Sequence, residues 1–525
     1  MNGKSGTAAV RMPALVALFT VAPLVEARRC LSLSSLLGGD VWWHLSSGLW
    51  ILHNHALPHN GLFSQAPGNS WAAVSWLYDL KLAVFYQLFG LRAIPIFAML
   101  CKMGLAVVTF LLAGGWRRNF WPAVGLSAVA QYILGSAAPT PVYGSILFFG
   151  LELLLLLETR RSLWSAGARV PHAAWTLPPV FLVWANMDVH FFDGLVLLVI
   201  FVTTIMLPFD FSFAPSGPES SGSETHGIHR GLHSAAASRL SLSNLTSATA
   251  SRFLLLIAAA CFVGTAITPN VVQPYRVFFA SVFGAGSAYV PDYKAPGFRQ
   301  PQDYVLVLLT MAAFLALGLR RSRDLFLVAI LVIASALSFY SQRDVWLTVI
   351  VAAAVIGEML DEDPLAASEN ARPGSSPAKS LGLAFVVAVV VVVVGAAALT
   401  PRSQSALLAK AAQSYPVGAS DYIRAHGLPR PIFNAFEWGG FLTYYLPECP
   451  VAIDGRTDLY GDDFIVQYSK AMSAEIRYTD FAPMANAQAF LLPRAAIMAG
   501  ALGTLPGYRV AYQDDVSTVI TKENR

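Results

Sequence analysis

The chain carries little charge for its length. Asp, Glu, Lys and Arg make up 13% of its 525 residues, whereas 55% are hydrophobic. Typical soluble domains have about 25% charged residues. The net charge of +4 is small, and the basic residues occur in short turns rather than in one patch. This composition excludes an ordinary soluble globular protein and argues against a nucleic-acid partner.

The chain also has few cysteines. The four are scattered, and three of them lie in or beside apolar segments: Cys30, Cys101, Cys261 and Cys449. Disulfide frameworks and zinc sites both need closer or more regular spacing. The cysteine pattern therefore points to neither.

Long apolar segments dominate what is present. Lipid offers no hydrogen bonds to the backbone, so we expect these segments to be helices even where valines run together, as at 389–394. The segment 12–25 also has the features of a signal peptide, but we favour an uncleaved first helix. The candidate crossings lie at 13–37, 92–114, 119–137, 142–158, 175–188, 190–208, 252–268, 302–319, 324–340, 344–360 and 381–399.

The stretch 71–90 decides the topology, because it is apolar but interrupted by Asp79 and Lys81. Basic turns favour the cytoplasmic side of a membrane. All of them fall there only if 71–90 lies along, or dips into, the outer surface. We therefore predict eleven crossings, with a cytoplasmic N-terminus and an extracytoplasmic C-terminus. The basic turns placed inside are Lys4/Arg11, Arg117/Arg118, Arg160/Arg161, the 209–250 loop and Arg320/Arg321/Arg323.

This topology divides the chain in two. We expect residues 1–399 to form the transmembrane domain, with an external loop at 38–91. The polar segments 209–250 and 361–380 have too little apolar content to fold alone and should be cytoplasmic linkers. Residues 400–525 have the composition of a soluble domain. The predicted fold class is an α-helical polytopic membrane protein with a small C-terminal α/β extracytoplasmic domain.

The same topology gathers the unusual polar clusters on one side. In the C-terminal domain we expect helices at 406–413, 419–426 and 462–476, and strands at 431–435, 451–454, 508–513 and 517–521. This whole domain falls at the outer face, although the charge rule did not require it. The clusters that join it there are 40–44, 140–141, 186–190, 270–276 and 342–344. We therefore predict an external active site.

The most unusual motif is Gly-Gly-Asp-Val-Trp-Trp-His-Leu, where the first apolar segment ends. Asp40 and His44 share a face if this segment is helical. Asp40 is then a candidate base toward a hydroxyl, or a candidate ligand of a divalent cation. The alternative is an interfacial anchor, in which Asp40 caps a helix and Trp42 and Trp43 belong to an aromatic belt.

Four polar residues interrupt the apolar hairpin near 188: Asn186, Asp188, His190 and Asp193. Two crossings need only a simple polar turn between them, and that is the alternative interpretation. Charged groups so close to a bilayer are costly and usually functional. We therefore favour a role in lining a cavity.

Arg343 falls at the outer end of a crossing, against the usual distribution of basic residues. A guanidinium there suits a lipid-linked phosphate, which it can bind with two hydrogen bonds. The alternative is a salt bridge to the adjacent Asp344. Arg276 is a second candidate, and the loop 291–296 is a candidate cover for the site.

Two motifs stand out in the C-terminal domain: Trp438-Gly-Gly and the turn Asp454-Gly-Arg-Thr-Asp. We expect Arg456 to pair with Asp454 or Asp458. In the functional interpretation this turn closes over the Asp40 loop and contacts the substrate. In the alternative, it is a structural ion pair inside a small domain.

Together these motifs resemble an uncharacterised bacterial family of polytopic membrane proteins with a GT-C-like glycosyltransferase fold. The signature Asp-x-Trp-Trp-His-Leu-x-x-Gly-x-Trp-Ile-Leu matches residues 40–52. The chain departs from the family at Thr140-Pro141, where Arg-Pro is usual, and at 187–190. Further matching segments are 184–186, 274–275, 341–343, 415–416, 436–442 and 453–460.

The resemblance implies a membrane glycosyltransferase in the bacterial inner membrane. It would transfer a sugar from a polyprenyl-phosphate-linked donor to an envelope acceptor on the outer side. Asp40 would be the catalytic base or a metal ligand, His44 its partner, and a divalent cation (Mg²⁺ or Mn²⁺) a candidate cofactor. The implied substrate-binding residues are Arg343, Asn186, Asp188, His190, Arg276, Trp438, Asp454, Arg456 and Asp458.

A second hypothesis is a non-catalytic transporter or scaffold for envelope polysaccharide. Transporters often show paired repeats with broken helices near the midplane. The sequence shows no such repeat, and its polar residues gather at one face instead. The enzyme is therefore the leading hypothesis.

Overall fold

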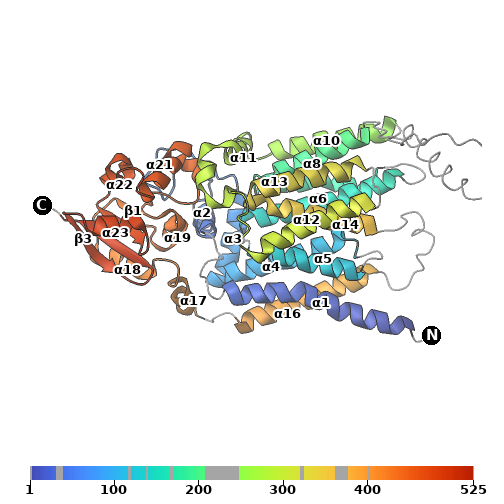
Figure 1. Cartoon of the computed structure of the whole chain (residues 1–525), viewed down its shortest axis with the longest axis horizontal. Helices are drawn as coiled ribbons and strands as arrows, with labels where there is room; N and C mark the ends of the chain where they lie inside the picture. The colour runs from blue at the N-terminus through green and yellow to red at the C-terminus, as the bar shows by residue number, and fades with distance from the viewer. Residues whose placement is uncertain are drawn as a thin grey trace, which may run out of the picture.

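The computed structural model describes residues 3–30, 39–115, 120–136, 140–164, 170–206, 248–319, 324–360, 377–399 and 403–523. A bundle of long helices, called the helical layer below, occupies one end of the molecule, and a smaller α/β region occupies the other (Figure 1). The N-terminus lies at the free end of the helical layer, and the C-terminus lies at the tip of the α/β region. The chain is therefore elongated.

The long helices run in alternate directions along the molecule, so their connections collect at two ends (Figure 1). A glycine-led 3-10 turn, η1 (Gly90–Arg92), joins α3 to α4. The helices of the layer are α1 (Gly3–Cys30), α4 (Ala93–Leu112), α5 (Phe120–Ile133), α6 (Pro141–Trp164), α7 (Leu177–Ala185), α8 (Phe191–Met206), α10 (Ala248–Ala266), α12 (Pro301–Leu319), α13 (Leu325–Tyr340), α14 (Val345–Leu360) and α16 (Pro377–Leu399).

Each apolar stretch predicted from the sequence overlaps one of these helices, so a mostly helical chain is confirmed. Among the described residues, three segments are long and apolar enough to cross a membrane by length and composition: Trp76–Leu112, Pro141–Leu163 and Pro301–Leu319. Helix α7 has only nine residues, about 14 Å at 1.5 Å per residue. The count of eleven crossings therefore stays a prediction, as does the orientation.

The outer surface of the layer is apolar. On α12, Leu308, Met311 and Leu315 are 63%, 61% and 59% exposed and follow one another at helical spacing. A soluble protein rarely exposes such a continuous apolar row. A row of this kind is expected where helices face hydrocarbon.

An ion-pair network fixes the end of the layer where α6 and α14 finish. Arg160 pairs with Asp324 at the start of α13 and with Glu358 near the end of α14. Arg161 contacts the same Glu358. Arg160 is 4% exposed, so these charges are largely withdrawn from solvent and compensate one another.

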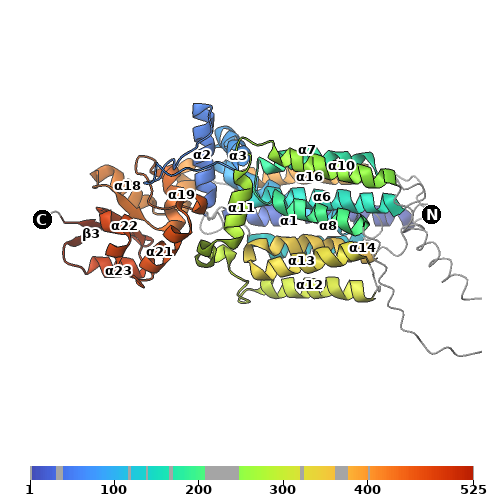
Figure 2. The ribbon, with the colours of Figure 1, turned by 90° about the horizontal axis from the view of Figure 1, so that it is seen from above.

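Three short α-helices and three 3-10 turns lie where the two regions meet. Helices α2 and α3 lie beside each other at the end of the helical layer, and α11 crosses the same end (Figure 2). The turn η5 follows α11 and is joined to the α/β region, because the Ala285 N–H donates to the Asp462 carboxylate at 2.8 Å. These elements are α2 (Asp40–Asn54), α3 (Trp76–Phe89), α11 (Gln273–Phe283), η5 (Ala285–Tyr289) and η6 (Pro291–Tyr293), with η7 (Gln342–Asp344) beneath them.

A four-stranded sheet in the order β1-β2-β4-β3 forms the centre of the α/β region. Strands β1 and β2 are parallel, and the other two pairs are antiparallel. Phe433, Phe490 and Ile520 align across the sheet and are buried under its helices. The elements are β1 (Ile432–Asn434), β2 (Ala489–Pro493), β3 (Tyr508–Gln513), β4 (Ser517–Lys522), α17 (Gln404–Ala411), α18 (Val417–His426), α19 (Phe436–Tyr445), α20 (Thr457–Tyr460), α21 (Asp462–Met472), α22 (Ala482–Asn486) and α23 (Ile497–Gly503).

The sequence-based strand at 451–454 is wrong. Val451 forms only an isolated bridge with Ser64, and the residues after it make a buried turn. The strand beside β1 is instead β2, which was not predicted because it is short and ends in proline.

The segment after α2 is bound tightly to the α/β region. The Val451 N–H donates to the Phe63 carbonyl at 2.9 Å, and the Gln65 N–H donates back to Val451 at 2.8 Å. Trp42 is fully buried among the rings of Tyr415, Phe441 and Tyr444. Helix α2 is therefore held between the two regions.

The proposed linkers 209–250 and 361–380 lie largely outside the described residues, and so do the basic turns at 117–118 and 320–323. The predicted domain boundary at residue 399 also stays a prediction, because it adjoins residues 400–402, which are not described.

Candidate active site

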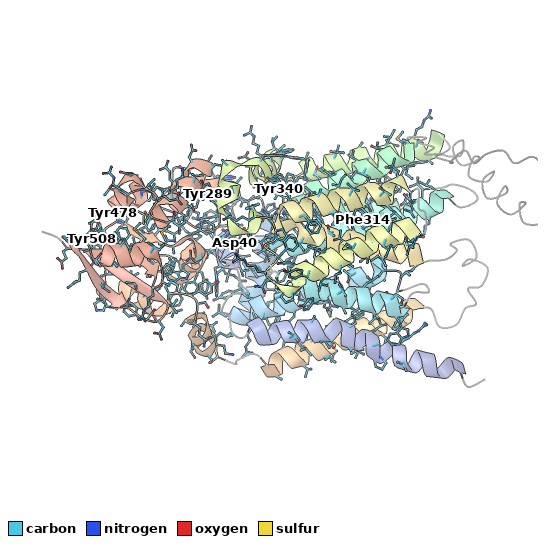
Figure 3. The ribbon with its side chains drawn as sticks, viewed as in Figure 1. Asp40, Tyr289, Phe314, Tyr340, Tyr478 and Tyr508 are labelled. Atoms are coloured by element: carbon cyan, nitrogen blue, oxygen red, sulfur yellow. The ribbon has the colours of Figure 1, made fainter. Side chains whose placement is uncertain are left out.

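Asp40 is the first residue of α2 and lies where the helical layer meets the α/β region (Figure 3). Its carboxylate accepts a hydrogen bond from the Trp43 indole at 3.1 Å. Desolvation raises the pKa of Asp40 above its ordinary value, and attraction to His44 opposes that rise. A carboxylate with a raised pKa is a better base than an exposed one. Trp42 is buried rather than placed in a surface belt.

Two glycines let the α/β region approach Asp40 closely. A Cβ on Gly455 would lie 1.8 Å from Asp40 Oδ1, so no larger residue fits there without movement. A Cβ on Gly440 would lie 1.9 Å from the carbonyl oxygen of Gly39. The Trp-Gly-Gly and Asp-Gly-Arg motifs therefore pack directly on the loop that carries Asp40.

His44 is held by an acid that sequence reasoning did not select. His44 Nδ1 lies 2.6 Å from Asp79 Oδ1, and both side chains are buried. The imidazole stacks on Trp43, with ring centroids 3.6 Å apart. A carboxylate partner fixes the ring orientation and tautomer of a histidine. The only sequence signal for Asp79 was a lone acid in an apolar stretch.

The predicted metal site does not fit the described side chains. Asp40 and His44 supply two donors, whereas Mg²⁺ takes about six oxygen ligands, with protein carboxylates among them. Among the described residues, no group of three His, Cys, Asp or Glu side chains is arranged to hold a metal ion. We therefore derive no step through a metal ion.

A polar cavity of about 700 Å³ lies between α11, η7 and the α/β region. Three residues predicted to bind substrate line it: Arg276, Arg343 and Asp458. Trp71 lies on the same wall, beneath the guanidinium of Arg456 at 4.9 Å from the ring centroid. Asp462 also lines the cavity and accepts a hydrogen bond from the Ala285 N–H at 2.8 Å, which joins α21 to η5.

An apolar groove of about 310 Å³ runs into the helical layer beside this cavity. Its walls come from α6, α8, α11, α13 and α14, and its polar end includes His190, Asp193 and Asp344. The apolar side chains that shape it include Phe149, Val196, Phe278, Ile330, Ala334 and Leu347.

The cavity and the groove share three lining residues: Ser281, Tyr293 and Arg343. Arg343 donates to the Tyr293 hydroxyl and lies over its ring, 5.0 Å from the centroid. The attraction of Arg343 also acts to lower the pKa of Asp40, so the two charges are coupled. Arg343 thus lies at the junction of a polar chamber and an apolar channel.

Two residues that were predicted to bind substrate instead make hydrogen bonds to neighbouring parts of the fold. Asn186 accepts from the Trp76 indole at 2.9 Å and donates to the carbonyls of Leu182 and Ile267. Asp188 accepts from Ser145 at 2.6 Å and is 4% exposed. Both therefore position the turn before α8 rather than face the cavity.

Three predicted residues of the α/β region also lie away from the cavity. Trp438 is 4% exposed and donates to the Ser414 carbonyl at 3.0 Å. Arg456 is 1% exposed and makes a bidentate pair with Asp454, with a shortest contact of 2.6 Å. This arrangement favours the structural interpretation of the Asp-Gly-Arg turn, with Asp458 as its contact with the cavity.

Two cavity and groove residues were noticed in the sequence without being selected. Tyr293 lies in the 291–296 loop, which was expected only to cover the site. Asp193 interrupts the start of α8 and lies 2.7 Å from His190 Nδ1. An acid three residues after a histidine at a helix start was the available signal.

Comparison with known proteins gave structural similarities alone. No family model and no curated protein matches the chain. The oligosaccharyltransferase AglB of Archaeoglobus fulgidus, solved with an inhibitory peptide and a dolichol-phosphate, is 13% identical with a TM-score of 0.49. That match covers 90% of this chain and 69% of the other.

ArnT of Cupriavidus metallidurans, solved with undecaprenyl phosphate, is 13% identical with a TM-score of 0.46, covering 98% of each chain. A structure of the Archaeoglobus enzyme with Zn and sulfate has a TM-score of 0.44 at 12% identity, covering 93% of this chain and 67% of the other. These three TM-scores are below 0.5, so the function proposed below is argued from the residues of the site.

Proposed function

We propose that this protein is a membrane glycosyltransferase that uses a polyprenyl-phosphate-linked sugar as donor. The acceptor is an envelope component, and transfer occurs on the outer side of the membrane. The C-terminal α/β region lies on that side and binds the acceptor.

The observation that carries the proposal is the junction at Arg343. A lipid-linked sugar has an apolar chain, a phosphate and a polar sugar in that order. The structure offers an apolar groove, a guanidinium and a polar cavity in the same order. Guanidinium groups bind phosphate with paired, charge-assisted hydrogen bonds. Because the parts of the site follow the same order as the parts of the lipid-linked sugar, the site supports a donor of this class.

Asp40 supports the transfer step as base. The acceptor oxygen attacks the anomeric carbon of the sugar, and its proton passes to the Asp40 carboxylate. The bond between that carbon and the phosphate oxygen breaks, and the phosphate leaves with both electrons. Arg343 stabilises the leaving phosphate. Asp79 keeps His44 oriented beside Asp40.

Lipid analysis tests this proposal against the scaffold hypothesis. Mass spectrometry of lipids that co-purify with the protein should detect a polyprenyl phosphate sugar. On incubation with an envelope extract, the sugar should be lost from that lipid. If the folded protein binds the lipid-linked sugar but leaves it unchanged, the scaffold hypothesis is favoured. Absence of any polyprenyl lipid would contradict the donor class.

A further inference from the structure

His190 has one ring nitrogen committed and one free. Its Nδ1 lies 2.7 Å from Asp193 Oδ2 at the start of α8. Its Nε2 is buried and has no hydrogen-bond partner among the described residues. The side chain is 5% exposed and lines the polar end of the apolar groove together with Asp193. A buried nitrogen without a partner is costly, so it is expected to meet a ligand.

The surroundings of His190 are strongly charged. Asp188 and Asp193 lie on its own segment, and Arg343 and Asp344 face it from η7. Phe278 of α11 and Trp346 of α14 close the remaining sides edge-on, with ring centroids 6.1 Å away. Desolvation and Arg343 oppose the charged ring, but Asp188 and Asp193 outweigh them and raise the pKa of His190. The two carboxylates therefore favour the charged form of the ring.

We propose that the His190–Asp193 pair is a second, titratable ligand for the lipid phosphate, specific for the charge state of the leaving group. The proposal rests on the function proposed above. It goes beyond that function because it assigns His190 a selective role that Arg343 lacks. Arginine stays charged at all relevant pH values, whereas histidine changes charge near neutrality.

Sugar transfer changes the charge of the lipid phosphate, and His190 responds to this change. In the donor, the phosphate is a diester with one negative charge. When the bond to the sugar breaks, it becomes a monoester whose second pKa is about 6, so it reaches a charge near −2. A protonated His190 donates from Nε2 to this added charge, while Asp193 stabilises the imidazolium. An interaction stronger after bond cleavage than before it lowers the barrier.

Binding of two lipids as a function of pH tests the proposal. Undecaprenyl phosphate serves as the monoester probe, and its monomethyl ester serves as a diester with one charge. The substitution His190→Gln should weaken monoester binding by about tenfold at pH 7, as expected for losing one hydrogen bond to a charged group. Diester binding should change by less than about threefold. His172→Gln, at an exposed histidine of η3 (His172–Thr176), is the matched control.

A second variant covers the case in which His190→Gln does not fold. Asp193→Asn keeps the ring but removes the charge that supports its proton. The pH at which monoester binding weakens should move downward in this variant. Equal losses for both lipids, or unchanged pH profiles in both variants, would overturn the proposal while leaving the transferase intact. Failure of the wild-type protein to bind either lipid would instead contradict the proposed function.

Discussion

At the scale of single residues, two distant charges define the site. Asp40 begins α2 and Arg343 lies in η7, yet the fold couples their electrostatic energies. The sequence pointed to both residues because each is a charge where an apolar segment ends. It did not point to Asp79, because one acid in an ambiguous segment has no partner until α3 packs beside α2.

The coupling of Asp40 to Arg343 predicts the pH dependence of transfer. Asp40 must be ionised to accept a proton, so the rate should fall as pH drops through its raised pKa. Arg343→Gln removes an attraction that lowers this pKa, so the acid limb of the rate profile should move to higher pH. Arg276→Gln, also in the cavity, should reduce the rate without moving the limb. Initial rates between pH 4 and 9 would check this, and coincident limbs in all three proteins would refute the coupling.

Arg456 should act on stability. The pair with Asp454 is almost completely buried, with side-chain exposures of 1% and 0%. Removing one partner of a buried pair typically costs about 3–5 kcal/mol. Arg456→Ala should therefore lower the thermal midpoint, and activity should fall in step with it. Arg477→Ala breaks an exposed pair with Asp480 and should leave both unchanged. If activity is lost while the thermal midpoint is unchanged, Arg456 contacts the substrate, and the structural interpretation is wrong.

At the scale of elements, close backbone packing creates the site. The predicted helices at 406–413, 419–426 and 462–476 correspond to α17, α18 and α21, because their amphipathic patterns were clear. Helix α19 and strand β2 were not predicted. Their glycines and proline contradict local propensity, and tertiary contacts decide their structure instead.

Gly455 offers a direct test of that packing. In Gly455→Ala the new Cβ would clash with the Asp40 carboxylate, 1.8 Å away. We expect transfer to fall at least tenfold, because small displacements of a catalytic group are costly. Gly500→Ala in α23, where a Cβ meets nothing within 4 Å, should leave transfer unchanged. Equal activity in the two variants would show that Asp40 is not held by this contact.

The apolar groove makes a separate prediction on α13. Ala334 lines the groove and is 4% exposed, so Ala334→Trp should fill it. Binding of undecaprenyl phosphate should weaken by at least tenfold, while the polar cavity stays open. Ala336→Trp, on the exposed face of the same helix, is the control. Calorimetric or fluorescence titration in detergent would measure this. A lipid that binds both variants equally does not occupy the groove.

At the scale of the whole molecule, composition predicted the helical layer and charge distribution predicted one polar end. The long apolar runs were sufficient for the helices, because lipid allows few other structures. Which end faces outward is still a prediction, because the basic turns at 117–118, 320–323 and most of 209–250 are not among the described residues.

Cysteine labelling tests the orientation. A cysteine at Ser473, an exposed position at the end of α21, should react with an impermeant thiol reagent in intact cells. A cysteine at Ser221 should react only after the cells are opened. The described native cysteines, Cys101, Cys261 and Cys449, are buried and should give a low background. The reverse pattern would place the site on the cytoplasmic side.

The central claim is that Asp40 is the base in transfer of a lipid-linked sugar, and a single-turnover assay tests it most directly. Purified protein loaded with radiolabelled polyprenyl phosphate sugar would be mixed with envelope acceptor, and labelled product would be followed. Asp40→Asn should bind the donor normally, keep its thermal midpoint and transfer at least about 100-fold more slowly. Asp480→Asn, at an exposed acid of η8 (Tyr478–Asp480), should transfer at the wild-type rate. Wild-type transfer by Asp40→Asn would contradict the account.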